Sequence, residues 1–386
     1  MRDGLGARAR TYLDHNATSP VRPGVAEAVA RALELPGNPS SVHAEGRAAR
    51  ALVEGAREQV AALVGARARD VVFTGGGTEA NATVLRPGPA TPRLLVGATE
   101  HPSVRDGHGF PPDAVRTIPV DGGGLIDQAW LERDLAGGGP ALVSVQAANN
   151  ETGVVQPLAE LARLVHAHDG VLHADAVQAL GRLPIDLASP GPDVVTLSAH
   201  KIGGPKGVGA LVLASDRGRG GGALLRGGGQ ERGLRAGTEN VPGIAGFGGA
   251  AESVRAGFAA ETARVERLRD ACADALRRIA PEAVILGEAT PRLPNTLLFA
   301  LPRLSAETAL MLFDLAGVAV SSGAACSSGR VRRSHVLDTM GVAPALAAGA
   351  VRVSLGWSSA EEDVESFARA CESVVRTLYH RGASAA

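Results

Sequence analysis

Lys201 is the residue of this sequence best suited to covalent chemistry. It ends the run Ser198-Ala199-His200-Lys201, which follows the apolar stretch 194–197 and precedes a glycine-rich segment. An amine where a buried strand meets a loop can contact a ligand, and a dry environment near other cations favours its uncharged, nucleophilic form. Ser198 and His200 supply donors suited to a phosphate. Taken alone, the run would favour a solvated lysine in a turn, so the prediction depends on the elements that would complete a site.

The segment Thr74-Gly75-Gly76-Gly77-Thr78-Glu79 could supply a phosphate site. It follows the strand-like residues 70–73 and predicts a helix that begins at Thr78. The free N–H groups and the dipole of a helix start attract an anion, which makes Gly77 and Thr78 candidates for phosphate contact. The spacing matches neither a P-loop nor the GxGxxG of dinucleotide folds. Because the chain has 50 glycines, this segment is a weak signal by itself.

Asp175 adds the group that a pyridine ring would need. It follows the apolar residues 171–172, and a carboxylate there can pair with the protonated ring nitrogen of pyridoxal phosphate (PLP) and maintain the ring as an electron sink. Asp175 could equally be a helix cap. Gln178 lies on the same side of the segment if it is helical. His101 follows the strand-like residues 94–96, although a lone histidine is more often structural. Together with Lys201, these residues predict a PLP pocket.

The chain resembles the cysteine desulfurases, PLP enzymes of the class V aminotransferase group with the fold type I architecture. The matching motifs cover nearly the whole chain in family order, and as a set they are specific. They lean toward the long-loop branch, of the nitrogen-fixation and iron–sulfur-cluster type. The motifs are 12–18, 37–41, 75–79, 99–101, 149–153, 173–178, the run at Lys201, 235–240, 321–326 and 351–356.

The resemblance implies roles for individual residues. Lys201 would carry PLP as a Schiff base and remove the Cα proton of L-cysteine, while His101 would stack on the ring and assist proton transfer. Thr238 would reach the phosphate of the neighbouring subunit, which makes a homodimer the expected unit. The substrate carboxylate would be bound by Arg352, Asn150 and Asn38. The other implied cofactor contacts are Gly77, Thr78, Asn150, Asp175, Gln178, Ser198 and His200.

Cys326 is the thiol that the resemblance assigns to sulfur transfer. It lies in a run of small residues, 323–329, suited to a flexible loop, whereas Cys272 and Cys371 lie in helical patterns and are expected in the core. The Cys326 thiolate would attack the substrate sulfur, leaving a persulfide and L-alanine, and an acceptor protein would then take the sulfur. Cys326 could also transiently ligate a nascent iron–sulfur cluster, but no metal is expected in the desulfurase site.

The composition limits the other partners and the compartment. A net charge of −1 gives no electrostatic reason to expect nucleic acid or a membrane surface as a partner. Three cysteines without a CxxC pair argue against a disulfide framework or a thiolate zinc site, and for a reducing compartment. No apolar segment approaches membrane-spanning length, and we expect a cytoplasmic protein.

Alternating β-rich and helical stretches from 70 to 213 predict an α/β fold with a doubly wound, mostly parallel sheet and a smaller α+β domain. We expect a large PLP-binding domain over 15–250. Residues 251–386, with 1–14, would form the small domain that carries the Cys326 loop and Arg352. A long helix over 252–279 would connect the two, and a helix over 360–379 would be the last element.

Several alternatives stay open at this point. The chain could be another class V enzyme, either an aminotransferase, which the Cys326 loop disfavours, or a selenocysteine lyase. A metal-dependent hydrolase could use His101, His173, Asp175 and His200, although this leaves Lys201 unused. A PLP-fold protein that only docks partners is a further possibility.

The sulfur acceptor is also open, because two features depart from the family pattern. The segment 330–335 is basic, with Arg330, Arg332 and Arg333, where the long-loop branch often has an acid and a proline. The chain also ends soon after the last expected helix. The arginines could be solvated, or they could attract an acidic acceptor and favour the Cys326 thiolate. Nitrogenase, housekeeping iron–sulfur and tRNA-thiolation pathways all remain possible.

Overall fold

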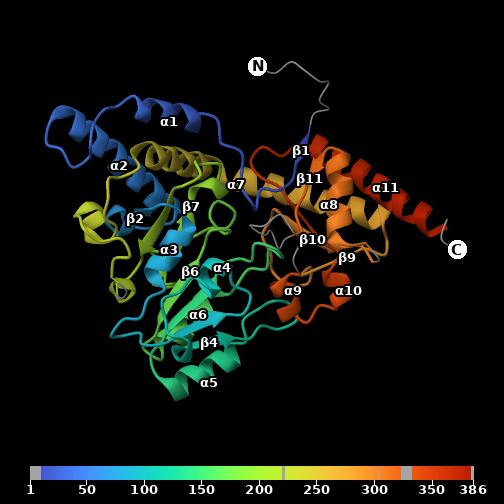
Figure 1. The fold of residues 1–386 in the computed structure, drawn as a ribbon, viewed down its shortest axis with the longest axis horizontal. Helices are drawn as coiled ribbons and strands as arrows, with labels where there is room; N and C mark the ends of the chain where they lie inside the picture. Colours follow the sequence, from blue (N-terminus) through green and yellow to red (C-terminus); the bar gives the residue numbers. More distant parts are fainter. Residues whose placement is uncertain (1–9, 220–221, 303, 323–332, 384–386) are drawn as a thin grey trace.

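A seven-stranded sheet forms the centre of the larger part of the molecule (Figure 1). The computed structural model describes residues 10–219, 222–302, 304–322 and 333–383. The strand order is β2-β8-β7-β6-β5-β3-β4; β8 is antiparallel to both of its neighbours, and the other pairs are parallel. The predicted fold class is therefore correct. The strands are β2 (Val71–Thr74), β3 (Leu94–Gly97), β4 (Val115–Ile118), β5 (Leu142–Gln146), β6 (Val171–Asp175), β7 (Val194–Ser198) and β8 (Gly209–Leu213).

Helices cover both faces of this sheet because successive strand residues point to opposite sides. In β2, Val71 and Phe73 belong to the core formed with α2 and α7, whereas Val72 packs with α3 and α4. Farther along the sheet, α5 and α6 pack on β3 and β5. The helices are α1 (Val25–Leu33), α2 (Ala44–Leu63), α3 (Gly77–Val84), α4 (Pro102–Arg105), α5 (Gln128–Gly138), α6 (Leu158–His166) and α7 (Val241–Ile279). Short 3-10 turns occur at Ala68–Asp70, Pro112–Ala114, Ala199–Lys201, Asp216–Arg219 and Gln230–Gly233.

The smaller part has its own core beside the large sheet. Its antiparallel sheet has the order β12-β10-β9, and β1 pairs in parallel with β11. Phe313 and Phe367 stack at 5.9 Å between ring centroids, and Cys272 and Cys371 are buried in the same core, as predicted. Burial raises the pKa of Cys272 to about 12, so this thiol is chemically inert. The elements are β1 (Thr11–Tyr12), β9 (Val284–Ile285), β10 (Thr296–Ala300), β11 (Val318–Ala319), β12 (Ala350–Ser354), α8 (Ala306–Leu315), α9 (His335–Thr339), α10 (Pro344–Ala347) and α11 (Glu361–Ala383).

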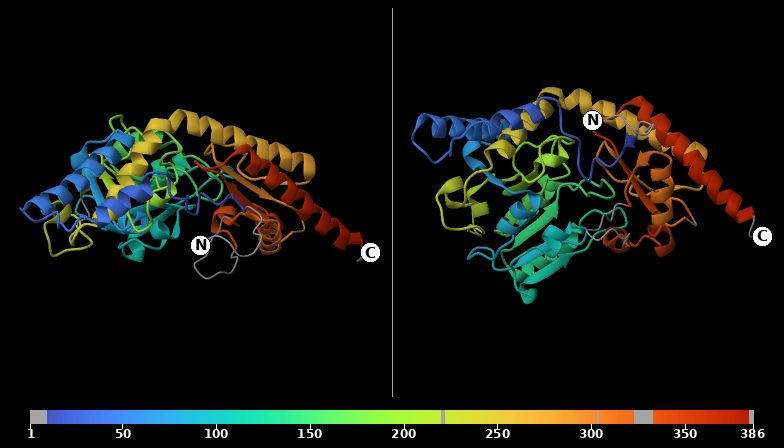
Figure 2. Two further views of the ribbon diagram at one scale, coloured as in Figure 1. Left: turned by 90° about the horizontal axis from the view of Figure 1, so that it is seen from above. Right: turned by 45° about the horizontal axis from the view of Figure 1, so that its top comes forward.

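Helix α7 runs along both parts (Figure 2). The prediction of its start at 252 was wrong by eleven positions, because the helix begins at Val241. Gly246 and Gly248, near the start of this helix, serve packing. A Cβ at Gly246 would lie 2.5 Å from the Pro205 ring, and one at Gly248 would lie 2.6 Å from the Cα of Ala56. The two glycines therefore let α7 approach its neighbours closely.

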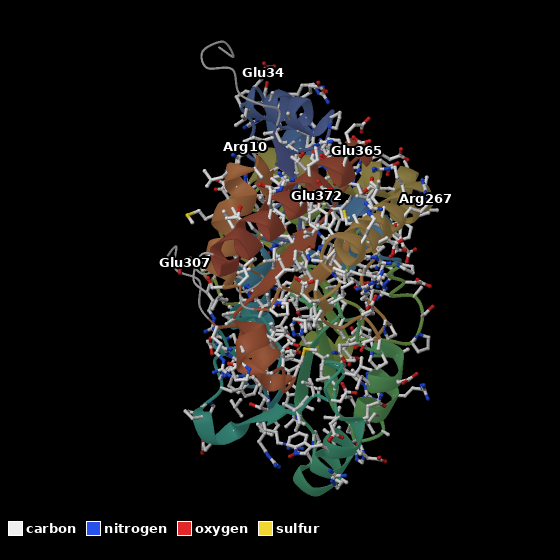
Figure 3. All side chains as sticks on the ribbon, turned by 90° about the vertical axis from the view of Figure 1, so that its right-hand side faces the viewer. Arg10, Glu34, Arg267, Glu307, Glu365 and Glu372 are labelled. Carbon is white, nitrogen blue, oxygen red and sulfur yellow. The ribbon has the colours of Figure 1, made fainter. Side chains whose placement is uncertain are left out.

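The outer surface of the smaller part is rich in charge. Seen from that side, Glu365 and Glu372 on α11 and Glu307 on α8 lie on the surface (Figure 3). None of the helices within the described residues is long and apolar enough to cross a membrane. The domain boundaries at 15 and 250 stay predictions, since α7 contributes to the cores of both parts.

Candidate active site

A cavity of about 270 Å³ lies where β5, β6 and β7 end and α3 begins. Carboxyl ends of parallel strands meet at one edge of a sheet, which is where open α/β folds bind ligands. Gln146 ends β5, Asp175 ends β6 and Ser198 ends β7, so each strand delivers a polar side chain to this edge. The cavity is lined by Gly77, Thr78, Asn81, His101, Ser103, Gln146, Ala148, Asn150, Asp175, Val177, Gln178, Ser198, His200 and Lys201.

Most of the predicted site residues line this cavity, and three described ones do not. Arg352 is 1% exposed and packs beside the cavity, whereas Asn38 and Thr238 are exposed. Cys326 lies outside the described residues, as do Arg330 and Arg332. The predicted residues that the structure brings together are Gly77, Thr78, His101, Asn150, Asp175, Gln178, Ser198, His200 and Lys201.

The Lys201 amine is placed for nucleophilic chemistry. Its Nζ donates to the backbone oxygens of Asn16 at 2.6 Å and Ala17 at 2.9 Å. Burial, followed by the positive charges of Arg182 and Arg352, lowers the pKa of Lys201 to about 7, although Asp14 and Asp175 oppose the shift. A substantial fraction of this amine is therefore uncharged near neutral pH.

Asp175 is held by donors that stabilise its ionised form. One carboxylate oxygen accepts from the Asn81 side-chain amide at 2.8 Å, and the other accepts from the Val177 N–H at 3.0 Å. Nearby Glu100 is buried, and burial followed by the charge of Asp175 raises its pKa well above the usual range. The raised pKa of Glu100 disfavours a second negative charge beside Asp175, whose carboxylate, with its two donors, is suited to a cationic ring nitrogen.

The two site histidines are neutral near pH 7. Burial lowers the pKa of His200 to about 4, assisted by Lys201 and Lys206, and its Nδ1 lies 3.2 Å from the Thr18 hydroxyl. Burial also lowers the pKa of His101. Its Nδ1 accepts from the Ser103 N–H at 3.1 Å, so the hydrogen of the neutral ring is on Nε2. His101 can therefore present a hydrogen-bond donor to a ligand in the cavity.

Arg352 connects the site to the smaller part. Its guanidinium pairs with the Asp14 carboxylate at 2.6 Å and donates to the Asn150 carbonyl at 2.8 Å, and its Nε has no partner among the described residues. Burial of an arginine requires such anionic partners. Asp14 therefore supplies the carboxylate that pairs with the Arg352 guanidinium, and the same guanidinium contacts the backbone of the cavity-lining residue Asn150.

Thr238 lies on a firmly anchored segment outside the cavity. Glu231 accepts two hydrogen bonds from Arg57, at 2.7 and 2.8 Å, and one from the Phe73 N–H at 2.9 Å. Arg235 pairs with Glu79 in the first turn of α3 at 2.9 Å. Thr238 itself is exposed and lines a separate hollow beside Gly75. The cavity of its own chain thus receives nothing from Thr238.

The match to a protein-family model decides the family. The model of aminotransferase class-V matches residues 11–367. The chain belongs to this family. It is 43% identical to a cysteine desulfurase of Cereibacter sphaeroides over 92% of each chain. The X-ray structure of a NifS-like protein from Rickettsia africae matches with a TM-score of 0.86 and 35% identity, over 95% of this chain and 99% of that one. The structure of SspA in complex with cysteine matches with a TM-score of 0.77 and 28% identity, over 91% and 100% of the two chains.

These relatives place the chain among the cysteine desulfurases of the class-V family, whose cofactor is PLP. The cavity residues fit that cofactor. Lys201 provides the amine, Asp175 the anion for a ring nitrogen, and the start of α3 the N–H groups for a phosphate. A Cβ at Gly77 would lie 2.8 Å from the Val177 side chain, so the helix start can approach this wall only as glycine.

A metal-dependent hydrolase is not supported by the residues suggested for it. Both ring nitrogens of His173 are used, by Ser144 at 2.8 Å and Thr196 at 3.3 Å. The described part of the chain contains no group of three histidine, cysteine, aspartate or glutamate residues placed to hold a metal ion.

The basic segment 330–335 has one arginine among the described residues, Arg333. It pairs with the carboxylate of Asp338, which partly offsets its positive charge.

Sequence reasoning missed several residues of the site. Asn81 and Ser103 line the cavity, and Asp14 holds Arg352. Asn81 stands in the first helix after the glycine-rich segment, three residues beyond Thr78, and this spacing on one helix face was the available signal. The pairing of residues 14 and 352 leaves no local signal in the sequence.

Proposed function

We propose that the chain converts L-cysteine to L-alanine and transfers the sulfane sulfur to Cys326. The observation that supports this most directly is the convergence of Lys201, Asp175 and His101 on one cavity in a chain of the cysteine desulfurase group. SspA, a relative in fold and sequence, has been solved with cysteine bound. PLP, when bound, accepts electron density from the substrate Cα and so acidifies its proton. The protein must then position the substrate, move protons and accept the sulfur.

Lys201 is the proposed base for the Cα proton. The uncharged Nζ can accept a proton once it is freed from the cofactor, and the same amine can return a proton to the product. Asp175 stabilises the protonated ring nitrogen by its negative charge, which its two N–H donors maintain. Since His101 carries its hydrogen on Nε2, we assign it as a donor to the ligand rather than as the base.

Arg352 and Asn150 are the proposed carboxylate site. A substrate carboxylate would replace the Asp14 carboxylate at the guanidinium or share it, because a planar fork binds such anions well. Cys326 would attack the substrate sulfur as a thiolate. The C–S bond breaks, the sulfur becomes the outer atom of a persulfide on Cys326, and the former Cβ receives a proton to complete the alanine methyl group.

We also propose that the chain acts as a cytoplasmic homodimer in which Thr238 reaches the cofactor phosphate of the partner subunit. The exposure of Thr238 on an anchored segment supports this arrangement. Asn38 is exposed too, and we assign it to the substrate site of the partner subunit or to its border. The acceptor is proposed to be an iron–sulfur scaffold or a thiolation enzyme.

The test is the visible spectrum of the purified protein with PLP, followed by sulfide and alanine assays with L-cysteine and a small thiol reductant, which releases the persulfide sulfur as sulfide. We expect a coloured protein that forms both products in equal amounts. Cys326→Ser should still bind PLP and respond spectrally to L-cysteine, but release no sulfide. Cys371→Ala, a buried thiol, is the control and should retain turnover. A colourless protein that ignores added PLP would contradict the proposal, and full activity in Cys326→Ser would contradict the assigned thiol.

The same assay distinguishes cysteine desulfurase activity from selenocysteine lyase activity. A desulfurase that uses Cys326 needs this thiol for L-cysteine. Turnover of L-selenocysteine alone, with no sulfide from L-cysteine, would replace the proposed substrate.

A further inference from the structure

A series of buried polar side chains, joined by hydrogen bonds, crosses the seven-stranded sheet and ends at the cavity. Ser144 on β5 and His173 on β6 are register partners, and Thr196 on β7 is the register partner of Asp175, two residues beyond His173. Ser144, His173 and Thr196 are each 0% exposed. Asn81 on α3, 1% exposed, connects them to Asp175. The proposed function uses neither His173 nor Asn81. Buried polar groups of this kind are costly unless each hydrogen bond is made.

The direction of each hydrogen bond follows from Asp175. A carboxylate only accepts, so the Asn81 atom that faces it at 2.8 Å is the amide nitrogen. The Asn81 oxygen must then accept, and it receives the Thr196 hydroxyl hydrogen at 2.6 Å. Because the hydroxyl has one hydrogen, Thr196 Oγ1 can only accept from His173.

The remaining directions are fixed in the same way. The His173 Nε2–H donates to Thr196 at 3.3 Å, and the Nδ1 of neutral His173 accepts from the Ser144 hydroxyl at 2.8 Å. Burial lowers the pKa of His173 to about 4, in agreement with a neutral ring. Every hydrogen bond in this series is therefore donated in the direction of Asp175, whose carboxylate only accepts.

Asn81 also reaches the other face of the site. Its Nδ2 donates to the Ser103 Oγ at 3.0 Å, and this hydroxyl lies 2.8 Å from the Nδ1 of His101. The Ser103 hydroxyl accepts from Asn81, so its own hydrogen can point to His101 Nδ1, whose lone pair it shares with the Ser103 N–H. Both hydrogens of the Asn81 amide are used, one toward Asp175 and one toward the Ser103 hydroxyl.

We infer that Asn81 is a positioning residue that fixes the Asp175 carboxylate and, through the Ser103 hydroxyl, the His101 ring relative to one another, with Thr196, His173 and Ser144 locking its orientation. The Nε2–H tautomer of His101 is itself assigned by the Ser103 N–H. The inference rests on the proposed function, because it concerns two groups that meet the cofactor. Its consequence is that the acid at the ring nitrogen and the donor on His101 are positioned together by one amide.

The test measures the His101 tautomer by nitrogen NMR of the full-length protein labelled with ¹⁵N-histidine, with and without PLP, and measures the dissociation constant of PLP. His101→Asn identifies the resonance. We expect a single Nε2–H tautomer in the wild type. Asn81→Ala should shift the His101 ¹⁵N resonances, because the Ser103 hydroxyl loses the donor that orients it, and raise the PLP dissociation constant about tenfold or more, the effect of losing a charge-assisted bond.

Milder variants cover the case in which Asn81→Ala does not fold. Thr196→Val is nearly isosteric and should shift the His101 resonances in the same direction and raise the PLP dissociation constant by a smaller factor, about threefold. Thr83→Val is the matched control. It removes a hydroxyl of α3 that donates to the Glu79 carbonyl and takes no part in the hydrogen-bonded series. It should change neither readout.

Two results would overturn the inference. One is an Nδ1–H tautomer of His101 in the wild type, and the other is unchanged His101 resonances and PLP affinity in folded Asn81→Ala or Thr196→Val. Neither readout needs cysteine turnover. A wild type that makes no sulfide or alanine would contradict the proposed function. The His101 resonances and the PLP dissociation constants of the variants would still test the inference.

Discussion

The cavity around Lys201 and the segment around Thr238 are both anchored by buried hydrogen bonds, but they differ in where their functional side chains face. Lys201, Asp175 and His101 meet in one cavity of one chain. Thr238 is exposed beside a different hollow, although Glu231 and Arg235 hold its segment firmly. Thr238 is held in place but does not line the cavity around Lys201. This is the arrangement expected of a residue that contributes to a site on a second copy of the chain. We therefore interpret the first region as the catalytic centre and the second as a contribution to the partner subunit.

The segment at Thr238 is also strained. Glu231 and Arg232 have φ values of 47° and 57°, in the left-handed region. Each such residue costs about 1–2 kcal/mol relative to ordinary backbone. The paired hydrogen bonds between Glu231 and Arg57, buried from water, offset this cost and fix the course of the chain toward Thr238.

The largest effect should come from Lys201→Ala. The substitution removes the covalent attachment and the proposed base, so alanine production should fall by at least about 10³-fold. Borohydride reduction of the wild type and peptide mapping should place the cofactor label on Lys201. Lys206→Ala, at the chain's other lysine, is the control and should stay active. A label on Lys206 would contradict the assignment of the catalytic centre.

Hybrid dimers test the second region directly. Thr238→Ala should weaken PLP binding about tenfold through loss of a bond to a charged phosphate. In a dimer of one Lys201→Ala chain and one Thr238→Ala chain, the intact Lys201 would be served by the intact Thr238 of the other chain. We expect one site per hybrid with wild-type PLP affinity, measured by titration of the purified hybrid. Weak binding at that site would show that Thr238 acts within its own chain.

Cofactor attachment should depend on pH through the Lys201 amine. With a pKa of about 7, the reactive uncharged fraction grows as the pH rises, so attachment of PLP to cofactor-free protein should accelerate about tenfold from pH 6 to pH 8 and then level off. Arg182 is the second cause of the low pKa, after burial. Arg182→Gln should therefore move the rise to higher pH. Stopped-flow absorbance measures both profiles, and a rate that is flat over this range would exclude Lys201 as the titrating nucleophile.

Glu231→Gln should have the smallest effect, a loss of PLP affinity by a few-fold, because it acts through the position of Thr238. A double-mutant cycle separates this from general destabilisation. In a Thr238→Ala background, Glu231→Gln should change PLP affinity no further, while its effect on thermal stability persists. Additive losses of affinity would mean that Glu231 affects the site by another route.

The sequence predicted the residues that line the cavity better than the residues that support them. Asp175 and Ser198 end buried strands and Lys201 follows one, and the convergence of parallel strand ends is a general rule that needs no distant contact. The start of α7 was missed because its glycines are used for close packing, which depends on Pro205 and Ala56 in other segments. The ion pair between Asp14 and Arg352 joins the two ends of the chain, and the outward position of Thr238 depends on tertiary anchors. Neither follows from local pattern.

Helix α7 has a mechanical consequence for how the two parts can move. Its 39 residues correspond to a rod of about 58 Å. Phe247 near its start is buried with the large sheet, and Leu268 and Cys272 farther along are buried with the small one. Displacing one part from the other would bend this rod or strip apolar surface from half of it, and both are costly. The helix therefore acts as a strut between the two cores, and we expect it to resist changes in the distance between Arg352 and Lys201.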